Sequence, residues 1–214
     1  MEKLITAYSY IGEGKVFVNS RLIYYQEKIA TFAEFIKALY KQEQISYPKF
    51  YKMDSLSKLG FMSAELLLRH EKPGRYEPGS LAVVLANSSS SLDTDLIHQN
   101  SIRNRSAYFP SPSVFVYTLA NIVIGEICIR HGLKGENAFL ISETYNPQQL
   151  CQYASEIIDN HRAEACICGW VELMGNDFRA MTVLVEKAEN TPGQPGFTPL
   201  PFTGATLNEI IKVN

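Results

Sequence analysis

Three hydroxyl side chains lie where the sequence predicts a buried strand turning into a helix. The stretch SETYN (142–146) overlaps the end of the apolar run AFLIS (138–142) and supplies Ser142, Thr144 and Tyr145. Such an elbow is where many α/β enzymes place a nucleophile, and a hydroxyl there supports acyl transfer or hydrolysis if an adjacent base takes its proton. The elbow contains no cysteine and no histidine, so the sequence does not identify that base.

The cysteines and histidines have simpler explanations than catalysis. All four cysteines fall in apolar, periodic segments, and their spacing fits neither a zinc site nor a CxxC redox pair; they are Cys128, Cys151, Cys166 and Cys168. We expect them to be buried small side chains. None of the histidines forms an i, i+4 metal-binding pair or a hydrolase motif; they are His70, His98, His131 and His161. The sequence therefore predicts no metal site and no cofactor.

The serine run SSSS (88–91) follows the apolar segment LAVVLAN (81–87). Serine hydroxyls beside a helix N-terminus can hold an anion, but the glycine and lysine residues of a phosphate loop are missing. Capping of the next helix by Ser91 or Asp93, or a solvated turn, is the preferred interpretation.

Strands and helices alternate along the chain. Predicted strands cover 81–87, 138–142, 164–170 and 181–187, with a weaker one at 4–10. Predicted helices cover 55–70 and 148–161, the second opening with Asn146 as N-cap and Pro147 in its first turn. Their apolar faces are formed by Leu56, Leu59, Met62, Leu66 and Leu67, and by Leu150, Ala154, Ile157, Ile158 and His161. This order predicts an α/β fold with a mixed, mostly parallel sheet.

One predicted helix, 116–132, is apolar on almost every face and ends at Gly132 and Gly135. Such a helix is expected to be buried all round, either between two sheets or in a subunit interface. The segment 191–204 is rich in proline and glycine and is expected to form a loop or extended arm. We therefore divide the chain into a domain over 1–190 and a C-terminal tail over 191–214.

Bulk composition excludes several classes of protein. The chain has 214 residues, is 46% hydrophobic and 20% charged, and carries a net charge of −2. It has no basic stripe for nucleic acid, no apolar run of the ~20 residues that a membrane span needs, and no signal-peptide core. We expect a cytoplasmic protein in a reducing compartment.

The stretch FPSPSVFVYTLANIVIGEICIRHGLKGENAFLIS (109–142) resembles the β-ketoacyl-acyl-carrier-protein synthases, condensing enzymes of the thiolase-like fold. The resemblance rests on a Pro-Ser segment before the helix, the sequence YTLAN where the helix begins, and the sequence IRHGLKGEN where it ends. YKMDSLSKLGFMSAELLL (51–68) and EACICGWVEL (164–173) add support, so that the resemblance covers about 50–187. It implies a thiolase-like half domain with a buried central helix, corresponding to the N-terminal half of these enzymes.

The resemblance also implies where the family's nucleophilic cysteine would lie. Counted from the GLKG sequence (132–135), that position is Thr144, with Ser142 and Tyr145 as neighbours. The family's two catalytic histidines belong to a second half that no part of this chain matches. Residues implied to line an acyl tunnel or subunit interface are Phe115, Tyr117, Asn121 and Ile124.

The resemblance therefore suggests a non-catalytic partner of an active ketosynthase, similar to the short chain-length-factor-like proteins of aryl-polyene and polyketide pathways. Implied partners are a full-length ketosynthase or a second copy of the chain, and an acyl carrier protein. Two alternatives remain open. The chain is an acyltransferase, condensing enzyme or hydrolase that uses Thr144 or Ser142 with a base from a partner, or it is an acyl- or carrier-binding module.

Overall fold

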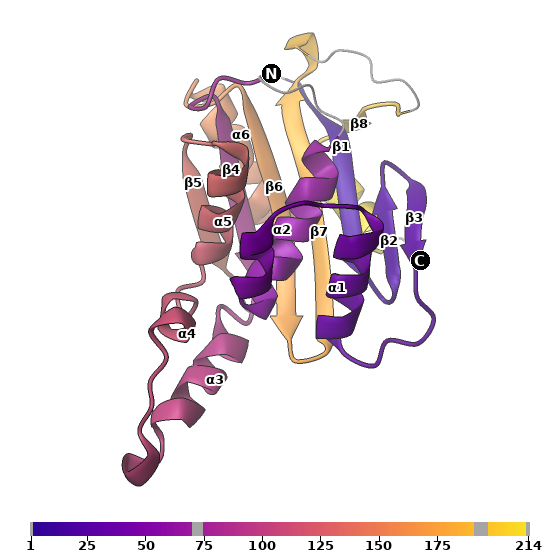
Figure 1. Cartoon of the computed structure of the whole chain (residues 1–214). Helices are drawn as coiled ribbons and strands as arrows, with labels where there is room; N and C mark the ends of the chain where they lie inside the picture. Colours follow the sequence, from indigo (N-terminus) through magenta and orange to yellow (C-terminus); the bar gives the residue numbers. More distant parts are fainter. Residues whose placement is uncertain (1, 70–74, 191–196, 213–214) are drawn as a thin grey trace.

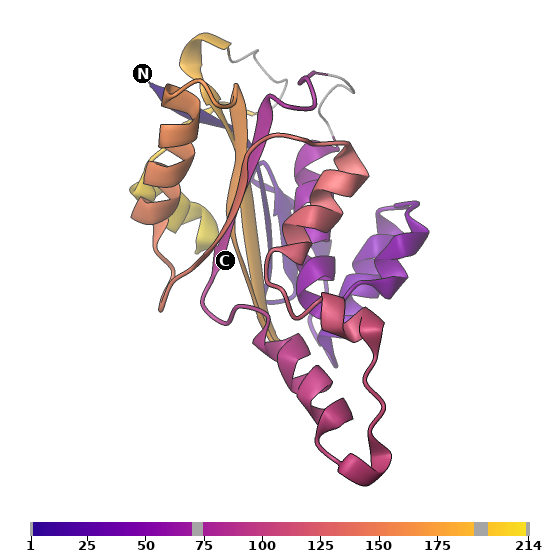
Figure 2. The same cartoon turned by 90° about the vertical axis from the view of Figure 1, so that its left-hand side faces the viewer.

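A mixed β-sheet runs through the middle of the molecule, with helices on both faces (Figures 1 and 2). The computed structural model describes residues 2–69, 75–190 and 197–212. The strands are β1 (Lys3–Gly12), β2 (Lys15–Val18), β3 (Arg21–Tyr25), β4 (Leu81–Asn87), β5 (Asn137–Ile141), β6 (Ala165–Met174), β7 (Asp177–Lys187) and β8 (Leu200–Pro201). Their order across the sheet is β3-β2-β1-β7-β6-β4-β5, and β8 pairs with β1.

The helices form two layers and a projecting arm. The α-helices are α1 (Phe32–Gln42), α2 (Ser55–Leu68), α3 (Leu92–Ile102), α4 (Pro112–Val116), α5 (Ile122–His131), α6 (Pro147–Asp159) and α7 (Gly204–Ile211). The short 3-10 turns are η1 (Pro48–Lys52), η2 (Arg105–Ala107) and η3 (Ala188–Asn190). Helices α1, α2 and α5 cover one face of the sheet, and α6 and α7 cover the other (Figure 2).

Local sequence accounts for the elements beside the elbow. Strand β4 is buried along its whole length, as its continuous apolar sequence predicts. Helix α6 begins at Asn146, whose side chain accepts a hydrogen bond from the Gln149 amide at 3.0 Å, and Pro147 occupies its first turn. Helix α5 ends at Gly132, which has a left-handed φ of 68°.

Most predicted elements are confirmed, with boundaries that differ by a few residues. The five predicted strands correspond to β1, β4, β5, β6 and β7, and the two predicted amphipathic helices correspond to α2 and α6. The apolar faces assigned to these helices are buried, apart from His161, which lies beyond the end of α6 and is exposed. Cys166 and Cys168 are buried and unpaired, and Cys128 and Cys151 are half-buried and unpaired.

The sheet is mixed, as predicted, but the expectation that it is mostly parallel is wrong. Only β4–β5 and β4–β6 are parallel pairs among the described strands. The pairs β1–β2, β2–β3 and β6–β7 are antiparallel. Each of these three joins consecutive strands through a turn too short for the crossover that parallel strands require.

In the chain by itself the most fully buried helix is α2, whereas the segment 116–132 is buried on its inner side. Ten residues of α2 are buried, including Gly60 and Ser63, because it packs on β1, β6 and β7 and is flanked by α1 and α5. The predicted helix 116–132 is interrupted: α4 ends at Val116, and α5 begins at Ile122. Outer side chains of α5 such as Ile129 are exposed, since α5 lies beside α2 near an edge of the sheet.

The segment after β7 returns to the sheet. Residues 191–196 of the predicted arm lie outside the described residues, whereas β8 pairs with β1. Helix α7, which the sequence reading did not predict, packs beside α6 through Leu207, Ile210 and Ile211.

Candidate functional site

The elbow joins β5 to α6 next to the C-terminal end of β4. The Ser142 amide donates to the Asn87 carbonyl at 3.0 Å, which extends the β4–β5 pairing by one residue. The Asn146 cap then starts α6, so both ends of the stretch 142–146 are fixed by hydrogen bonds. Because β4, β5 and β6 are parallel, their C-terminal ends gather at this edge, where α/β proteins commonly place their sites.

In the described part of the chain, neither the half-buried Ser142 hydroxyl nor the exposed Thr144 hydroxyl has a basic partner. The Ser142 hydroxyl donates to the Gln149 side-chain oxygen at 2.5 Å, a neutral amide that does not take the proton. Thr144 is exposed, and no side-chain hydrogen bond of it occurs within the described residues. Thr144 also precedes the Asn146 cap by two residues, so it lies outside the first turn of α6.

Tyr145 and Cys151 face inward and are less reactive than free side chains. Tyr145 packs edge-on against Trp170 at a ring separation of 5.4 Å. Burial is the main cause that raises the pKa of Tyr145 well above its usual value, and the nearby Cys168 and Cys151 add to the increase. Burial also raises the pKa of Cys151 to about 11, so little thiolate forms near neutral pH. Burial thus disfavours the ionised, more nucleophilic form of both groups.

The three described histidines are engaged elsewhere. His98 packs against Phe115 with 5.4 Å between the ring centroids. His131 Nε2 lies 3.3 Å from Glu65, and His161 Nδ1 lies 3.5 Å from the Lys187 ammonium group. His70 is outside the described residues. Among the residues that the structure describes, none forms with the elbow the nucleophile–base pair that acyl transfer uses.

The serine loop after β4 is closed by an acidic side chain that the sequence reading did not identify. The Glu172 carboxylate on β6 accepts hydrogen bonds from the Ser88 amide at 2.7 Å, the Ser88 hydroxyl at 2.6 Å and the Ser89 amide at 3.2 Å. A carboxylate occupies the donors that a phosphate would need, so the anion interpretation of SSSS is wrong. Ser91 is the N-cap residue of α3, but its hydroxyl donates to the Thr118 carbonyl at 2.6 Å instead of capping the helix.

A projecting arm, defined as residues 92–116, extends from the body next to the serine loop (Figures 1 and 2). Its base is fixed by several hydrogen bonds. The Thr94 hydroxyl donates to Asp54 at 2.8 Å, and the Gly175 amide donates to Asp93 at 3.0 Å. These contacts tie the arm to α2 and to the β6–β7 turn, and they give it a fixed direction.

The predicted tunnel and interface residues lie at the junction of the arm and α5, but they differ in what they contact. Phe115 is 61% exposed, and Asn121 is also exposed. Tyr117 turns inward and donates a hydrogen bond to Glu126 at 3.0 Å. Ile124 is buried in the core beneath α5. Phe115 and Asn121 are thus the members of this set that face outward.

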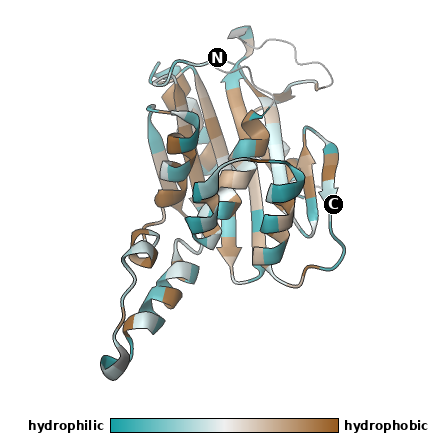
Figure 3. Cartoon of the chain, viewed as in Figure 1, coloured by the Kyte–Doolittle hydropathy of each residue, from teal (hydrophilic) through white to brown (hydrophobic). Residues whose placement is uncertain are grey.

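An apolar surface, which we call the apolar edge, follows this side of the molecule. Strand β5 is the last strand of the sheet order, so one side of its backbone has no neighbouring strand among those described. Exposed apolar side chains continue along β5, α5 and the arm: Phe115, Val116, Leu119, Ile129 and Ile141. Figure 3 shows hydrophobic colouring on these elements. An unpaired strand edge beside apolar side chains is typical of a protein–protein interface.

Two further observations concern metals and membranes. Within the described part of the chain, no group of three or more His, Cys, Asp or Glu side chains is placed to hold a metal ion. None of the helices described is both long and apolar enough to cross a membrane.

No family model matches the chain, and no curated protein matches it in sequence. Solved structures are similar in fold. The ishigamide ketosynthase/chain length factor matches with a TM-score of 0.69 and 18% identity, over 89% of this chain and 63% of that one. The ketosynthase ApeO in complex with its chain length factor ApeC, from Xenorhabdus doucetiae, matches with a TM-score of 0.57 and 13% identity, over 88% of this chain and 80% of that one.

A third match, AntDE:AntF, is a type II polyketide synthase acyl-carrier protein in complex with its ketosynthase. It has a TM-score of 0.62 and 13% identity, over 88% of this chain and 63% of that one. The chain thus spans under two thirds of the length of the ishigamide and AntDE:AntF chains. At these identities the comparisons show the fold, which is the thiolase-like α/β fold of the ketosynthases.

Proposed function

We propose that this chain, which has the ketosynthase fold, is a non-catalytic partner of an active ketosynthase and acts as a chain-length factor. The observation that carries the proposal is the elbow. It keeps a strand–turn–helix geometry at the position that resembles the family's nucleophile, but it presents the Thr144 hydroxyl without a thiol or a base. A condensing enzyme needs an activated nucleophile, whereas a partner subunit needs only the surrounding shape.

The apolar edge is the proposed contact with the ketosynthase. Ile129 is 64% exposed and Ile141 is 58% exposed, and exposed side chains of this kind lose water when a partner covers them. The outward face of α6 differs, because Gln148, Gln152 and Glu156 make it polar. The contrast between the apolar edge and the polar face of α6 supports a partner that covers the β5 side and a face of α6 that stays in contact with solvent. A second copy of the chain is the other occupant that this surface fits.

Within such a complex, Phe115 and Asn121 are the proposed contacts with the growing acyl chain. Phe115 adds a large apolar ring to the surface at the junction of the arm and α5, where it narrows any tunnel that the partner forms there. Thr144 lies in the turn that follows β5. The acyl groups would arrive on a carrier protein, since the AntDE:AntF structure contains an acyl-carrier protein in complex with its ketosynthase.

Reconstitution with a candidate ketosynthase, an acyl-carrier protein and a malonyl-carrier protein tests the proposal through the length of the product. We expect condensation only when the ketosynthase is present, and a defined product length only when this chain is added. Replacement of Phe115 by alanine is expected to lengthen the product, because it removes the ring that limits the tunnel.

Tyr25→Ala is the matched control. Tyr25 is also an exposed aromatic residue, but it lies on β3 at the opposite end of the sheet order. A product distribution that is the same with and without the chain, for a complex shown to form, would contradict the proposed role.

A further inference from the structure

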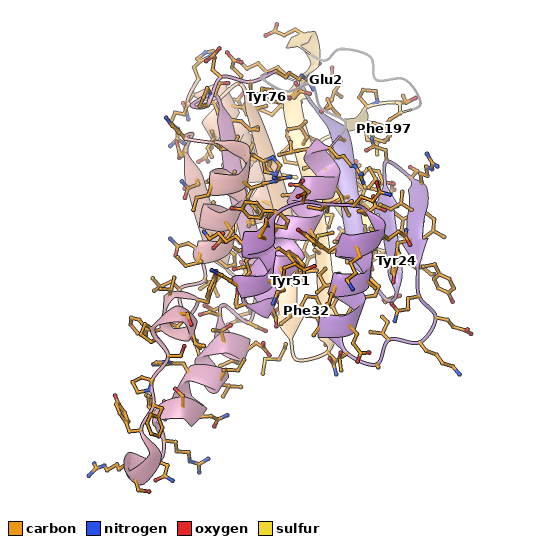
Figure 4. The ribbon with its side chains drawn as sticks, viewed as in Figure 1. Glu2, Tyr24, Phe32, Tyr51, Tyr76 and Phe197 are labelled. Atoms are coloured by element: carbon orange, nitrogen blue, oxygen red, sulfur yellow. The ribbon has the colours of Figure 1, made fainter. Side chains whose placement is uncertain are left out.

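A second feature of the structure lies away from the elbow and the apolar edge. It is a cavity of about 160 Å³ between the first turn of α1, the turn η1 and the first turn of α2. Figure 4 labels Phe32 and Tyr51, which line it from α1 and η1. No side chain of the described chain fills this space, although its floor belongs to the main core.

The floor and one wall of the cavity are apolar and rigid. Phe32, Ile36 and Phe50 form the floor, and each is at least 97% buried. Tyr51 stands at the wall, where its ring packs edge-on against Tyr40 at 5.5 Å and against Phe50 at 5.6 Å. Aromatic packing of this kind fixes ring orientation, so the wall is already formed in the free chain.

The mouth of the cavity carries two lysine side chains. Lys37 and Lys58 both line it, and no lining residue is acidic. Neither lysine forms a salt bridge within the described residues, whereas Lys49 nearby pairs with Glu126 at 2.8 Å. The closest acidic side chain on the same helix, Asp54, is engaged elsewhere by the Ser57 amide and the Thr94 hydroxyl.

Lys58 is half-buried at this position. Burial lowers the pKa of its ammonium group, and the Asp54 carboxylate opposes that shift only in part. An anion brought to the cavity mouth would stabilise the charged form of Lys58, which burial disfavours. The adjacent N-terminus of α2, which begins at Ser55, adds partial positive charge on the same side.

We propose that this cavity binds a small organic carboxylate with a compact apolar body, such as an aromatic acid, with the body on Phe32, Ile36 and Phe50 and the carboxylate on Lys58 and Lys37. The size supports this ligand class, since an engineered protein cavity of about 150 Å³ takes up benzene. A body of six carbons therefore fits the space, and a single carboxylate reaches the lysines at the mouth. The site is independent of the proposed ketosynthase partnership.

Titration of the ¹⁵N-labelled full chain with sodium benzoate, followed by amide chemical shifts, tests the proposal. We expect saturable shifts confined to residues 32–37 and 50–58. Benzyl alcohol has the same body without the charge, and acetate has the charge without the body. Each is expected to bind at least ~tenfold more weakly than benzoate, because a charge-assisted contact or the apolar contact is missing.

Lys58→Met keeps the length of the side chain and removes its charge, and it is expected to weaken benzoate binding by at least ~tenfold. Lys41→Met is the matched control, since Lys41 is an exposed lysine of α1 that does not line the cavity. Ala33→Phe, which fills the cavity from an exposed position on α1, gives an independent test if Lys58→Met fails to fold.

Absence of saturable shifts, binding of acetate as tight as that of benzoate, or full binding by both Lys58→Met and Ala33→Phe would overturn the proposal. Loss of binding in these two variants, with wild-type affinity in Lys41→Met, would establish the site.

Discussion

Replacement of Gly60 by alanine tests how α5, which carries part of the apolar edge, is seated on α2. A Cβ atom at Gly60 would lie 2.3 Å from Val123 Cγ2 on α5 and 3.5 Å from Val171 Cγ1 on β6. Ordinary Cβ contacts lie at 3.4–4 Å, so Val123 must move by about an ångström, against a side chain that is itself buried. The whole of α5 must shift if Val123 cannot.

Overpacking of this kind costs roughly 1–3 kcal/mol, and the contact at Gly60 belongs to the severe end of that range. Alanine recovers about 0.5–1 kcal/mol of helix propensity relative to glycine. We therefore expect Gly60→Ala to lower the free energy of unfolding by about 2 kcal/mol. Gly125→Ala is the matched control, because a Cβ atom at Gly125 meets nothing within 4 Å; it should gain about 0.5–1 kcal/mol.

Urea denaturation followed by circular dichroism measures the free energy of unfolding of both variants. A shift in the urea midpoint reports stability as long as the dependence of that free energy on urea concentration is unchanged. The two glycines lie in different helices but within one packed pair, so the comparison isolates the contact from helix propensity. Equal stability of Gly60→Ala and Gly125→Ala would refute the close packing of α5 on α2.

Three further predictions concern single side chains. Burial alone would raise the pKa of Glu65, but hydrogen bonds from Arg130 and His131 outweigh it and hold the pKa at about 2, against an ordinary value of 4.5. Stability from this depressed pKa is present above pH 4.5 and is lost as the pH falls towards 2, so Glu65→Gln should flatten the acid dependence of thermal unfolding in that window. Tyr145→Phe should raise the free energy of unfolding by roughly 1–3 kcal/mol, because the buried hydroxyl has no hydrogen-bond partner among the described residues and its desolvation is uncompensated; a lower urea midpoint would reveal a missing partner. Cys151 should react with iodoacetamide at pH 8 at least ~tenfold more slowly than a free thiol, since its pKa is about 11, and rapid labelling mapped to Cys151 would reopen the search for a nucleophile.

The central layer of the fold follows from local sequence patterns. Helix α6 is specified by the spacing of Leu150, Ala154 and Ile157 and by the Asn146 cap, all of which act within a few residues. Strand β4 is specified by an unbroken apolar run. Helix α1 was missed although Phe35 and Leu39 give it an amphipathic pattern, so that a signal for it was present in the sequence.

Other features depend on contacts that sequence does not display. An apolar helix has the same sequence pattern whether its outer face packs on the chain's own core or on a partner, so the sequence does not decide which of the two covers the outer face of 116–132. The contact between Glu172 and the serine loop joins positions 84 residues apart. At the elbow, the resemblance to the ketosynthases indicated Thr144 as the position of the family's nucleophile. The hydrogen bond from Ser142 to Gln149 is visible in the structure alone.

The most direct test of the central claim is intact-mass analysis of the chain after incubation with acyl- and malonyl-carrier protein, with and without a candidate ketosynthase. We expect no covalent adduct on this chain under either condition, because the described residues place no base next to the Thr144 and Ser142 hydroxyls. An acyl adduct on the isolated chain, mapped to Thr144 or Ser142, would contradict the proposed non-catalytic role and identify a hydroxyl-based acyltransferase.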